Sequence, residues 1–188
     1  MADDHHLVYG MLTDAVSGEL IEDTDDERLR QRLARYLFEE KGYFKDDLQV
    51  RLRHDVSGSG YFGYSITDIA VLLERRIVMI LRYGPGSLVS RERPTLAAAR
   101  TLVPGQIIPI AVVTNGREAE VLDVRRSRLI GIGLDAIPDR TELAYTVSGF
   151  DFSPVSDKQV AAEKRILMAY DGIEHSCACA EDWCKPSQ

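Results

Sequence analysis

The sequence predicts an α/β domain with a mixed β-sheet of about five strands flanked by helices. Three observations lead to this fold class. Apolar residues recur at helical spacing soon after Thr24. Nearly continuous apolar runs then occupy much of the chain between residues 61 and 124. An alanine-rich helical segment interrupts these runs, which is the order expected of a strand–helix–strand crossover.

The first predicted element is a helix that begins after Thr24. Thr24 and Glu27 have the spacing of a capping box. Gly42 can adopt the left-handed conformation that ends a helix, so we expect the helix to end near it. The apolar stripe of this helix consists of Leu29, Leu33, Tyr36 and Leu37. Its other face carries Arg28, Arg32 and Arg35.

Three strands are predicted next. Residues 48–56 alternate apolar and polar side chains, as in a strand with one buried face. After a loop at 57–60, residues 61–73 form a strand, and a tight turn leads directly into another strand at 76–83. The strand at 76–83 is almost entirely apolar, so we expect it at the centre of the sheet with both faces buried.

The second half of the chain predicts a helix, two strands and a final helix. Glycine and proline at 84–87 break the sheet, and Ser90 is expected to cap a helix that runs to about Leu102. Strands follow at 107–114 and 118–124, joined by the hairpin signal Asn115-Gly116. We expect residues 125–133 to be irregular. The last helix is predicted from Asp157 to Tyr170.

Composition limits the classes of function. The chain has 188 residues, 45% of them hydrophobic, and a net charge of −7, so any nucleic-acid contact must come from a local basic patch. Residues 1–27 contain nine acids and neither lysine nor arginine, which favours a solvated tail. No apolar stretch is long enough to cross a membrane and no signal-peptide pattern occurs, so a cytoplasmic location is expected.

One acidic residue stands out within the apolar strands. Asp68 is the only acid in residues 61–73, and a carboxylate there is unfavourable unless it is paired or bound to metal. Metal-dependent phosphodiester cleavage needs carboxylates for Mg²⁺ or Mn²⁺ and commonly a lysine, which a Glu-x-Lys on the next strand can supply. The triplet at that spacing is Ile80-Leu81-Arg82. Ile80 cannot bind metal, while Arg82 can bind a phosphate but cannot act as a base.

These segments resemble the N-terminal domain of type I restriction enzyme R subunits, a member of the PD-(D/E)xK nuclease superfamily. The resemblance rests on GELIEDTDDERLRQRLARYLFEEKGY, on TDIAVLLERRIVMILRYGPGSLVSRERPTLAAARTL and on IPIAVVTNGREAEVLD. More narrowly, GPGSLVSRE and the alanine-rich helix look like small stand-alone homologues. The resemblance implies a restriction-endonuclease-like fold over residues 24–143. It leaves an acidic extension at 1–23 and a C-terminal helix with a cysteine-containing tail at 144–188.

The resemblance also implies roles for individual residues. Asp68 corresponds to the metal-binding aspartate, and Glu27 to an acid that such nucleases place on the first helix. Arg82 stands at the lysine position, whereas Ile80 replaces the main acid. Glu92, in the following helix, could supply a relocated second acid; it could equally be an acid stabilised by the N-terminus of that helix.

A basic region accompanies these positions. Residues 75–100 contain six arginines and one acid, Glu92, which favours polyanion binding. The phosphate-binding surface expected there consists of Arg82, Ser87, Ser90, Arg91, Arg93 and Arg100. A solvated helix face is the alternative interpretation of the same arginines.

The C-terminal tail offers a separate and weaker metal motif. It contains His175, Cys177, Cys179 and Cys184, whose spacing is not a standard zinc pattern, so zinc or an iron–sulfur cluster is only weakly indicated. Reduced thiols on a flexible tail are a second interpretation, and a Cys177–Cys184 or Cys179–Cys184 disulfide in oxidised preparations is a third.

Three functions follow from the sequence. The first is a nuclease-fold, nucleic-acid-binding domain with a degenerate active site, for which DNA is a possible partner. The alternatives are a Mg²⁺-dependent endonuclease with a relocated acid, and an interaction or metal-binding module that acts through the cysteines. The sequence contains no G-x-x-x-x-G-K-[ST] loop, so we expect no ATP binding. It leaves the oligomeric state open.

Overall fold

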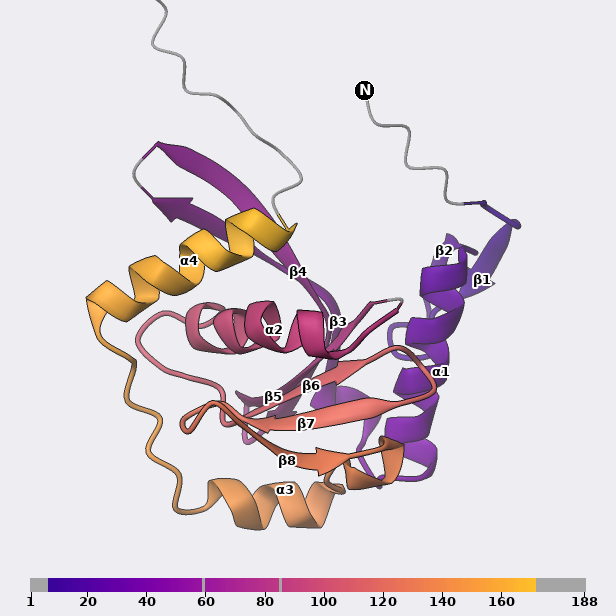
Figure 1. Ribbon diagram of the computed structural model, residues 1–188. Helices are drawn as coiled ribbons and strands as arrows, with labels where there is room; N and C mark the ends of the chain where they lie inside the picture. The colour runs from indigo at the N-terminus through magenta and orange to yellow at the C-terminus, as the bar shows by residue number, and fades with distance from the viewer. Residues whose placement is uncertain (1–6, 59, 85, 172–188) are drawn as a thin grey trace, which may run out of the picture.

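A six-stranded mixed sheet forms the centre of the protein (Figure 1). The computed structural model describes residues 7–58, 60–84 and 86–171. Strand order follows chain order, and every neighbouring pair is antiparallel except β5 and β6, which are parallel. The strands are β3 (Leu48–Gly58), β4 (Tyr61–Leu73), β5 (Arg76–Tyr83), β6 (Ile110–Thr114), β7 (Ala119–Asp123) and β8 (Arg128–Ile132).

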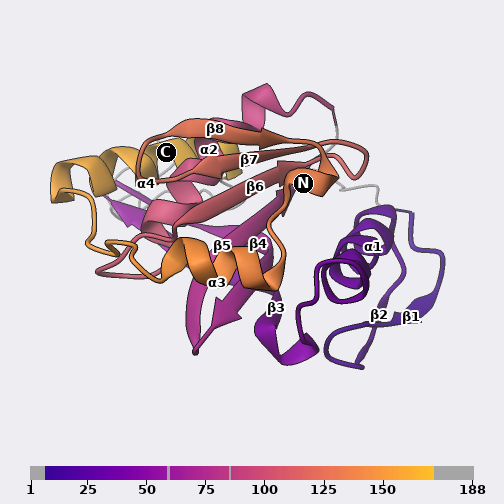
Figure 2. The same ribbon diagram turned by 90° about the horizontal axis from the view of Figure 1, so that it is seen from below.

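Helices cover both faces of this sheet, as the sequence predicts. Helices α2 (Val89–Thr101) and α4 (Asp157–Asp171) pack on one face, where their side chains join the core cluster that contains Ile80. Helices α1 (Asp25–Glu39) and α3 (Arg140–Val147) cover the other face. Figure 2 shows α3 beneath the sheet and α1 beside it.

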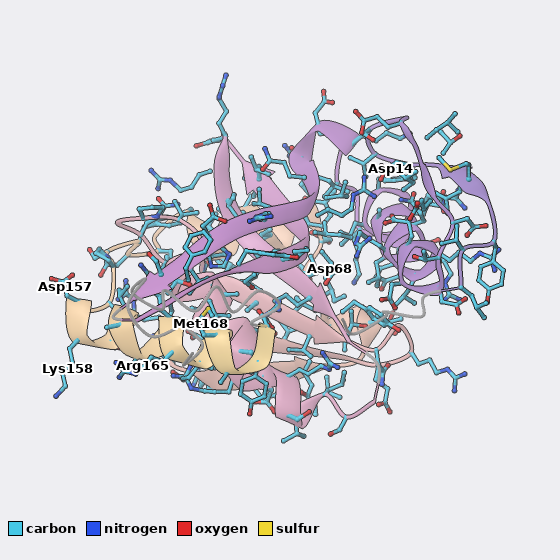
Figure 3. All side chains as sticks on the ribbon, turned by 90° about the horizontal axis from the view of Figure 1, so that it is seen from above. Asp14, Asp68, Asp157, Lys158, Arg165 and Met168 are labelled. Carbon is cyan, nitrogen blue, oxygen red and sulfur yellow. The ribbon has the colours of Figure 1, made fainter. Side chains whose placement is uncertain are left out.

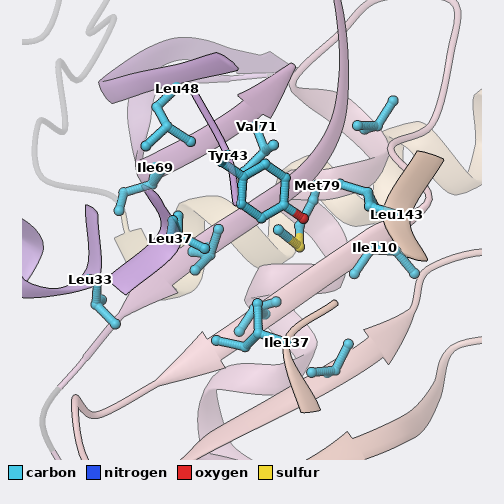
Figure 4. Close-up of a cluster of buried hydrophobic side chains, with 14 of the residues drawn as sticks. Leu33, Leu37, Tyr43, Leu48, Ile69, Val71, Met79, Ile110, Ile137 and Leu143 are labelled. Atoms are coloured by element: carbon cyan, nitrogen blue, oxygen red, sulfur yellow. The ribbon is translucent and has the colours of Figure 1, made fainter. Parts of the chain in front are cut away.

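The two faces bury separate apolar clusters because successive side chains of a strand point in opposite directions. Figure 4 shows the cluster beneath α1 and α3, in which Leu37, Ile69 and Met79 are fully buried. On β5, residues 78–81 are all at most 1% exposed. The prediction of a central strand buried on both faces is confirmed.

Tight turns connect the antiparallel strands where the sequence predicts them. Glu74 and Arg75 both have positive φ values, 50° and 64°, between β4 and β5. These values fit the two-residue turns whose twist matches that of antiparallel strands. Gly116, at φ +83°, occupies the predicted Asn-Gly turn between β6 and β7.

Helix α1 begins and ends as its sequence signals indicate. The Thr24 hydroxyl accepts a hydrogen bond from the Glu27 backbone N–H at 3.2 Å, so Thr24 is the N-cap. The Glu27 side chain does not complete the capping box, because it contacts other groups described below. Gly42, at φ +70°, follows shortly after the last turn.

Strands β3 and β4 change the face that they present at one position. Val50 packs with the cluster under α1, whereas Leu52, two residues later, packs with the cluster under α2 and α4. Two residues along a regular strand should share a face. Arg51, between them, has a φ of +53°. This conformation reverses the face of the sheet to which the following side chains point. Asp68 lies across from Arg51, between the pairs Val50–Ile69 and Leu52–Thr67.

Two sequence expectations about secondary structure are wrong. Residues 125–133 are not irregular, because β8 pairs with β7 at the edge of the sheet. The acidic N-terminal stretch is not simply a solvated tail. Within it, β1 (Met11–Thr13) pairs with β2 (Leu20–Glu22), and Ala15 donates its N–H to Gln31 of α1 at 2.6 Å.

The start of α2 also differs from the prediction. Leu88 is the N-cap, and Ser90 lies inside the helix with its hydroxyl donating to the Ser87 carbonyl at 3.1 Å. Helix α3 had no sequence prediction, whereas α4 matches its predicted range within one residue. None of the helices within the described residues has the length and apolar character needed to cross a membrane.

Candidate functional site

Three acids, two arginines and one glutamine meet between α1, the β1–β2 hairpin and the β3–β4 hairpin. We call this group the carboxylate cluster; it consists of Asp14, Glu27, Asp68, Arg30, Arg51 and Gln31. Helix α1 supplies Glu27, Arg30 and Gln31, whose i, i+3 and i+4 spacing places them on one face. The three carboxylate residues are each at most 8% exposed, so their charges need partners within the protein.

Asp68 is held by donors on both of its oxygens. The guanidinium of Arg30 donates to Oδ1 from NH2 at 2.8 Å and from Nε at 3.1 Å. The backbone N–H of Tyr83 donates to Oδ2 at 2.7 Å, where β4 and β5 separate. Figure 3 places Asp68 between the β3–β4 hairpin and α1. The carboxylate of Asp68, which is unfavourable among apolar strands unless it is paired, is therefore paired with Arg30.

Glu27 shares the same arginine and contacts a second one. Arg30 NH1 donates to Glu27 Oε2, so one guanidinium joins Glu27 to Asp68. Arg51 NH1 lies 3.0 Å from the same oxygen, and Gln31 donates to Oε1 at 2.9 Å. The structure thus brings together Glu27 and Asp68, the two acids that the sequence singled out.

Asp14 extends the cluster into the β1–β2 hairpin. Its Oδ1 accepts the backbone N–H groups of Val16 and Ser17, both at 2.8 Å. Its Oδ2 contacts Gln31 Nε2 and Arg51 NH2, both at 3.1 Å. Burial by itself raises the pKa of Asp14, but these donors outweigh burial and lower it below its ordinary value.

Arg30 keeps its positive charge in this setting. Burial on its own disfavours the charged guanidinium, yet the carboxylates of Asp68 and Glu27 outweigh burial and raise the pKa of Arg30. Its side chain is 12% exposed, so water screens these attractions only in part. Arg30 is therefore a fixed cation between two acids.

The cluster does not fit a divalent cation as it stands. Mg²⁺ requires free carboxylate oxygens at close to 2 Å in octahedral geometry. Here both oxygens of Asp68 and both oxygens of Glu27 already contact arginine, glutamine or backbone donors. Among the described residues, no three His, Cys, Asp or Glu side chains are grouped so that they could hold a metal ion. The metal role of Asp68 stays a prediction.

The remaining predicted catalytic residues, Arg82 and Glu92, lie apart from Asp68, and so does Ile80, which replaces the main acid. Ile80 is fully buried in the core under α2 and α4. Arg82 points to that same face, where its NH2 lies 2.7 Å from Asp171 Oδ2. Glu92 lies beside Glu120 of β7; burial and then the Glu92 charge raise the pKa of Glu120. Neither Arg82 nor Glu92 contacts the carboxylate cluster.

The predicted phosphate-binding residues do not form one surface. Arg100 is 5% exposed and its guanidinium binds Glu163 at 2.8 Å and the Val124 carbonyl at 2.6 Å, so it lies inside the protein rather than on a basic face. Arg93 pairs with the same glutamate at 2.6 Å. The small pocket next to Arg82, about 190 Å³, is lined in part by Ser90 and Arg91. Ser87 is exposed.

His54 lies near Arg82 under α2. Its Nε2 is 3.4 Å from the Thr101 hydroxyl. Burial, and then the charge of Arg82, lower the pKa of His54 from 6.5 to about 4, against weaker opposing effects of Asp171 and Asp55. The folded protein therefore holds this imidazole neutral in mildly acidic solution.

We expect this histidine to make the protein sensitive to mild acid. Between pH 6.5 and about 4, His54 takes up a proton in the unfolded chain but not in the folded protein. The contribution of neutral His54 to the free energy of unfolding is therefore fully present above pH 6.5 and is lost as the pH falls toward 4. Urea unfolding should show wild type losing about 2 kcal/mol more than His54→Gln across this window. Equal losses in the two proteins would contradict the low pKa.

A larger groove lies beside the carboxylate cluster. It has a volume of about 900 Å³ and runs between α1, Tyr83 at the end of β5, and the β6–β7 turn. The turn packs directly on α1, because a Cβ added to Gly116 would lie 2.2 Å from Leu29 Cδ1. The φ of +83° at Gly116 favours glycine at this position. The polar residues of the groove include Arg28, Arg32, Arg35, Tyr83, Asn115 and Arg117.

The groove carries a positive balance on an acidic protein. Four arginines line it, against two acids, Asp23 and Asp25. Arg28 is paired with Asp23 at 2.6 Å. Within the part of the chain that the structure describes, Arg32, Arg35 and Arg117 form no ion pair. These three side chains are available to an anionic ligand.

Comparison with known families decides the identity of the fold. The family model described as the type I restriction enzyme R protein N terminus, HSDR_N, matches residues 25–138, more than half of the 188 residues. The chain belongs to this family. Membership confirms the resemblance seen in the sequence and supports a nuclease-like fold. The searches of curated proteins and of solved structures find no match.

The part that matches the HSDR_N family contains most of the site. It includes Glu27, Arg30 and Asp68 as well as the groove residues from Arg28 to Arg117. Asp14 and the β1–β2 hairpin precede it. His175, Cys177, Cys179 and Cys184 lie outside the described residues, so the metal motif of the tail stays a prediction.

Sequence reasoning missed Asp14, Arg30, Gln31 and Arg51. Three of them have a local signal in the sequence. Arg30 and Gln31 follow Glu27 at helical spacing. Asp14 also precedes Ser17-Gly18, which is a turn signal. Arg51 gives no comparable signal, because its role depends on an unusual φ value within an otherwise regular strand.

Proposed function

We propose that this chain is a nuclease-like domain that binds nucleic acid through the groove between α1 and the β6–β7 turn, and that its metal-dependent catalytic site is degenerate. The observation that carries the proposal is the row of Arg28, Arg32 and Arg35 along one face of α1, opposite Arg117. Nucleic-acid binding depends on neutralising consecutive phosphates, which such a row of cations can do.

Two other groove residues suit contact with bases. Tyr83 offers an aromatic ring on which a base can stack. The Asn115 side-chain amide donates one N–H to the Gly86 carbonyl at 3.4 Å and keeps a second N–H for a base edge. Oδ1 of the Asn115 side chain accepts the backbone N–H groups of Arg117 and Glu118 at 3.0 and 2.9 Å, which fixes the orientation of the side-chain amide. The groove thus combines phosphate contacts with groups that could contact bases.

Degeneracy of the catalytic site is inferred from two features. Ile80 replaces the principal acid of the nuclease pattern and is buried in the core. Arg30 and Arg51 contact the carboxylate oxygens of Glu27 and Asp68 to which a catalytic metal would bind. An apolar residue and neutralised carboxylates are poorly suited to holding Mg²⁺.

One observation favours the alternative of an active Mg²⁺-dependent endonuclease. Glu27 and Asp68, acids from different elements, approach the same guanidinium. If Arg30 moved away on substrate binding, the two carboxylates could serve as a relocated acid pair. Incubation of plasmid DNA with Mg²⁺ or Mn²⁺ separates the two functions, since only the endonuclease predicts cutting that disappears in Asp68→Ala.

The groove is tested by removing its available charges. We expect the triple variant Arg32→Ala, Arg35→Ala and Arg117→Ala to bind duplex and single-stranded oligonucleotides roughly tenfold to a hundredfold more weakly. Its affinity should also depend less on salt, with a log–log slope smaller by about 2–3 for duplex DNA. Fluorescence anisotropy at several salt concentrations measures both quantities.

A variant with the same charge change provides the control. Lys158→Ala, Arg128→Ala and Arg165→Ala remove three exposed cations from β8 and α4, away from the groove. This variant should bind oligonucleotides much as wild type does. Equal weakening by both triple variants would reduce the effect to overall charge, and wild type that binds neither form of DNA nor RNA would overturn the proposal.

A further inference from the structure

The carboxylate cluster joins four parts of the chain through its two arginines. Arg30 connects α1 to Asp68 of β4, and Arg51 connects β3 to Glu27 of α1 and Asp14 after β1. Asp68 also holds the backbone of Tyr83 at the end of β5. The contacts therefore fix α1 against the strands whose ends border the groove.

The arginines of the cluster supply the amount of positive charge that one divalent cation would supply. Three carboxylates face two guanidinium groups, which together carry the two positive charges of one divalent cation. Arg30 lies between Glu27 and Asp68; the resemblance assigns metal binding to Asp68 and makes Glu27 the acid of the first helix. A guanidinium satisfies several carboxylate oxygens in one plane, so it can compensate two acids without a metal.

The backbone at Arg51 indicates that this arrangement is built into the fold. A left-handed φ of +53° is unfavourable for a residue that carries a side chain. The same residue marks the point where β3 changes the face that it presents to the core. Its conformation directs the guanidinium to Glu27 and Asp14, and both contacts are 3.1 Å or shorter.

We propose that Arg30, assisted by Arg51, is an internal replacement for the divalent cation, so that the carboxylates of a metal site hold the groove in shape instead of binding metal. Glu27 and Asp68 then form a latent divalent site that becomes available when Arg30 is removed. The inference rests on one part of the proposed function, namely that the metal-dependent catalytic site is degenerate. It is tested by metal binding alone, so its failure is distinguishable from failure of the groove to bind nucleic acid.

The test compares Mn²⁺ binding to wild type and to Arg30→Ala by the loss of the free-ion EPR signal. Wild type should show no binding that depends on Asp68. Arg30→Ala should bind Mn²⁺ at least roughly tenfold more tightly than wild type, because a nearby positive charge is removed and carboxylate oxygens are released. Adding Asp68→Asn to Arg30→Ala should abolish the gain, which locates the ion at the cluster.

Arg32→Ala is the matched control, since it removes the same charge from the same helix but on the side of the groove. It should leave Mn²⁺ binding at the wild-type level. Circular dichroism confirms that each variant is folded, and Arg30→Gln replaces Arg30→Ala if the latter does not fold. A folded Arg30 variant without increased Mn²⁺ binding would overturn the inference.

The wild-type protein provides an independent test that needs no change at Arg30. A ligand that binds the folded state raises the melting temperature, so millimolar Mg²⁺ should not stabilise wild type more than Asp68→Asn. If Mg²⁺ stabilises wild type and the effect is lost in Asp68→Asn, the site binds metal with its arginines present and the inference is wrong.

Discussion

Replacing Glu163 with alanine is expected to lower the free energy of unfolding by about 3–5 kcal/mol. Glu163 is fully buried on α4 and binds two arginines of α2. Its Oε1 accepts a hydrogen bond from Arg100 at 2.8 Å, and its Oε2 forms an ion pair with Arg93 at 2.6 Å. Removing the acid leaves Arg100, whose side chain is 4% exposed, as a buried charge without its carboxylate.

Thermal or urea unfolding measures this effect, and for a protein of this size the melting temperature should fall by roughly 10 °C. Glu163→Gln tests whether charge is responsible, because it keeps the shape and one acceptor. It should be less destabilising than Glu163→Ala. The double variant Glu163→Met with Arg100→Met should also be less destabilising than Glu163→Ala, since a buried ion pair replaced on both sides leaves no buried charge. A loss below about 1 kcal/mol for Glu163→Ala would contradict this account.

The parts of the fold that could be predicted from the sequence are those that depend on local patterns, unlike this long-range ion pair. The central strands, the Asn-Gly turn, the cap at Thr24 and helix α4 follow from local patterns, and all are present. Each depends on residues a few positions apart. Short or partly exposed elements such as β1, β2 and β8 were missed because three to five residues carry little periodicity.

The site was predicted only in part for a related reason. The family pattern identified Asp68 and Glu27, and the structure brings both to Arg30. The pairing of Arg30 with Asp68 joins residues 38 positions apart, and that of Arg100 with Glu163 joins residues 63 apart. Local spacing does not reveal such partners. The number of arginines in residues 75–100 therefore predicted Arg100 to lie on a basic surface, although its charge is paired with Glu163 in the interior.

The second large effect concerns Asp68. We expect Asp68→Ala to lower the free energy of unfolding by about 3 kcal/mol, because three hydrogen bonds end on this carboxylate and two come from a charged group. Asp68→Asn should be less destabilising, since the amide oxygen can still accept the Tyr83 N–H. Urea unfolding in the presence of EDTA measures both variants without a contribution from metal.

The sign of this change distinguishes a metal site from an arginine-filled one. In a metal-binding site without its metal, neighbouring carboxylates repel one another, so removing one acid relieves repulsion and stabilises the protein. In this protein each acid of the cluster contacts a guanidinium, and Asp68 and Glu27 share that of Arg30. Removing Asp68 should therefore destabilise the protein. Increased stability of Asp68→Ala in EDTA would mean that repulsion between the acids exceeds their attraction to the arginines, as expected of a site built to hold metal.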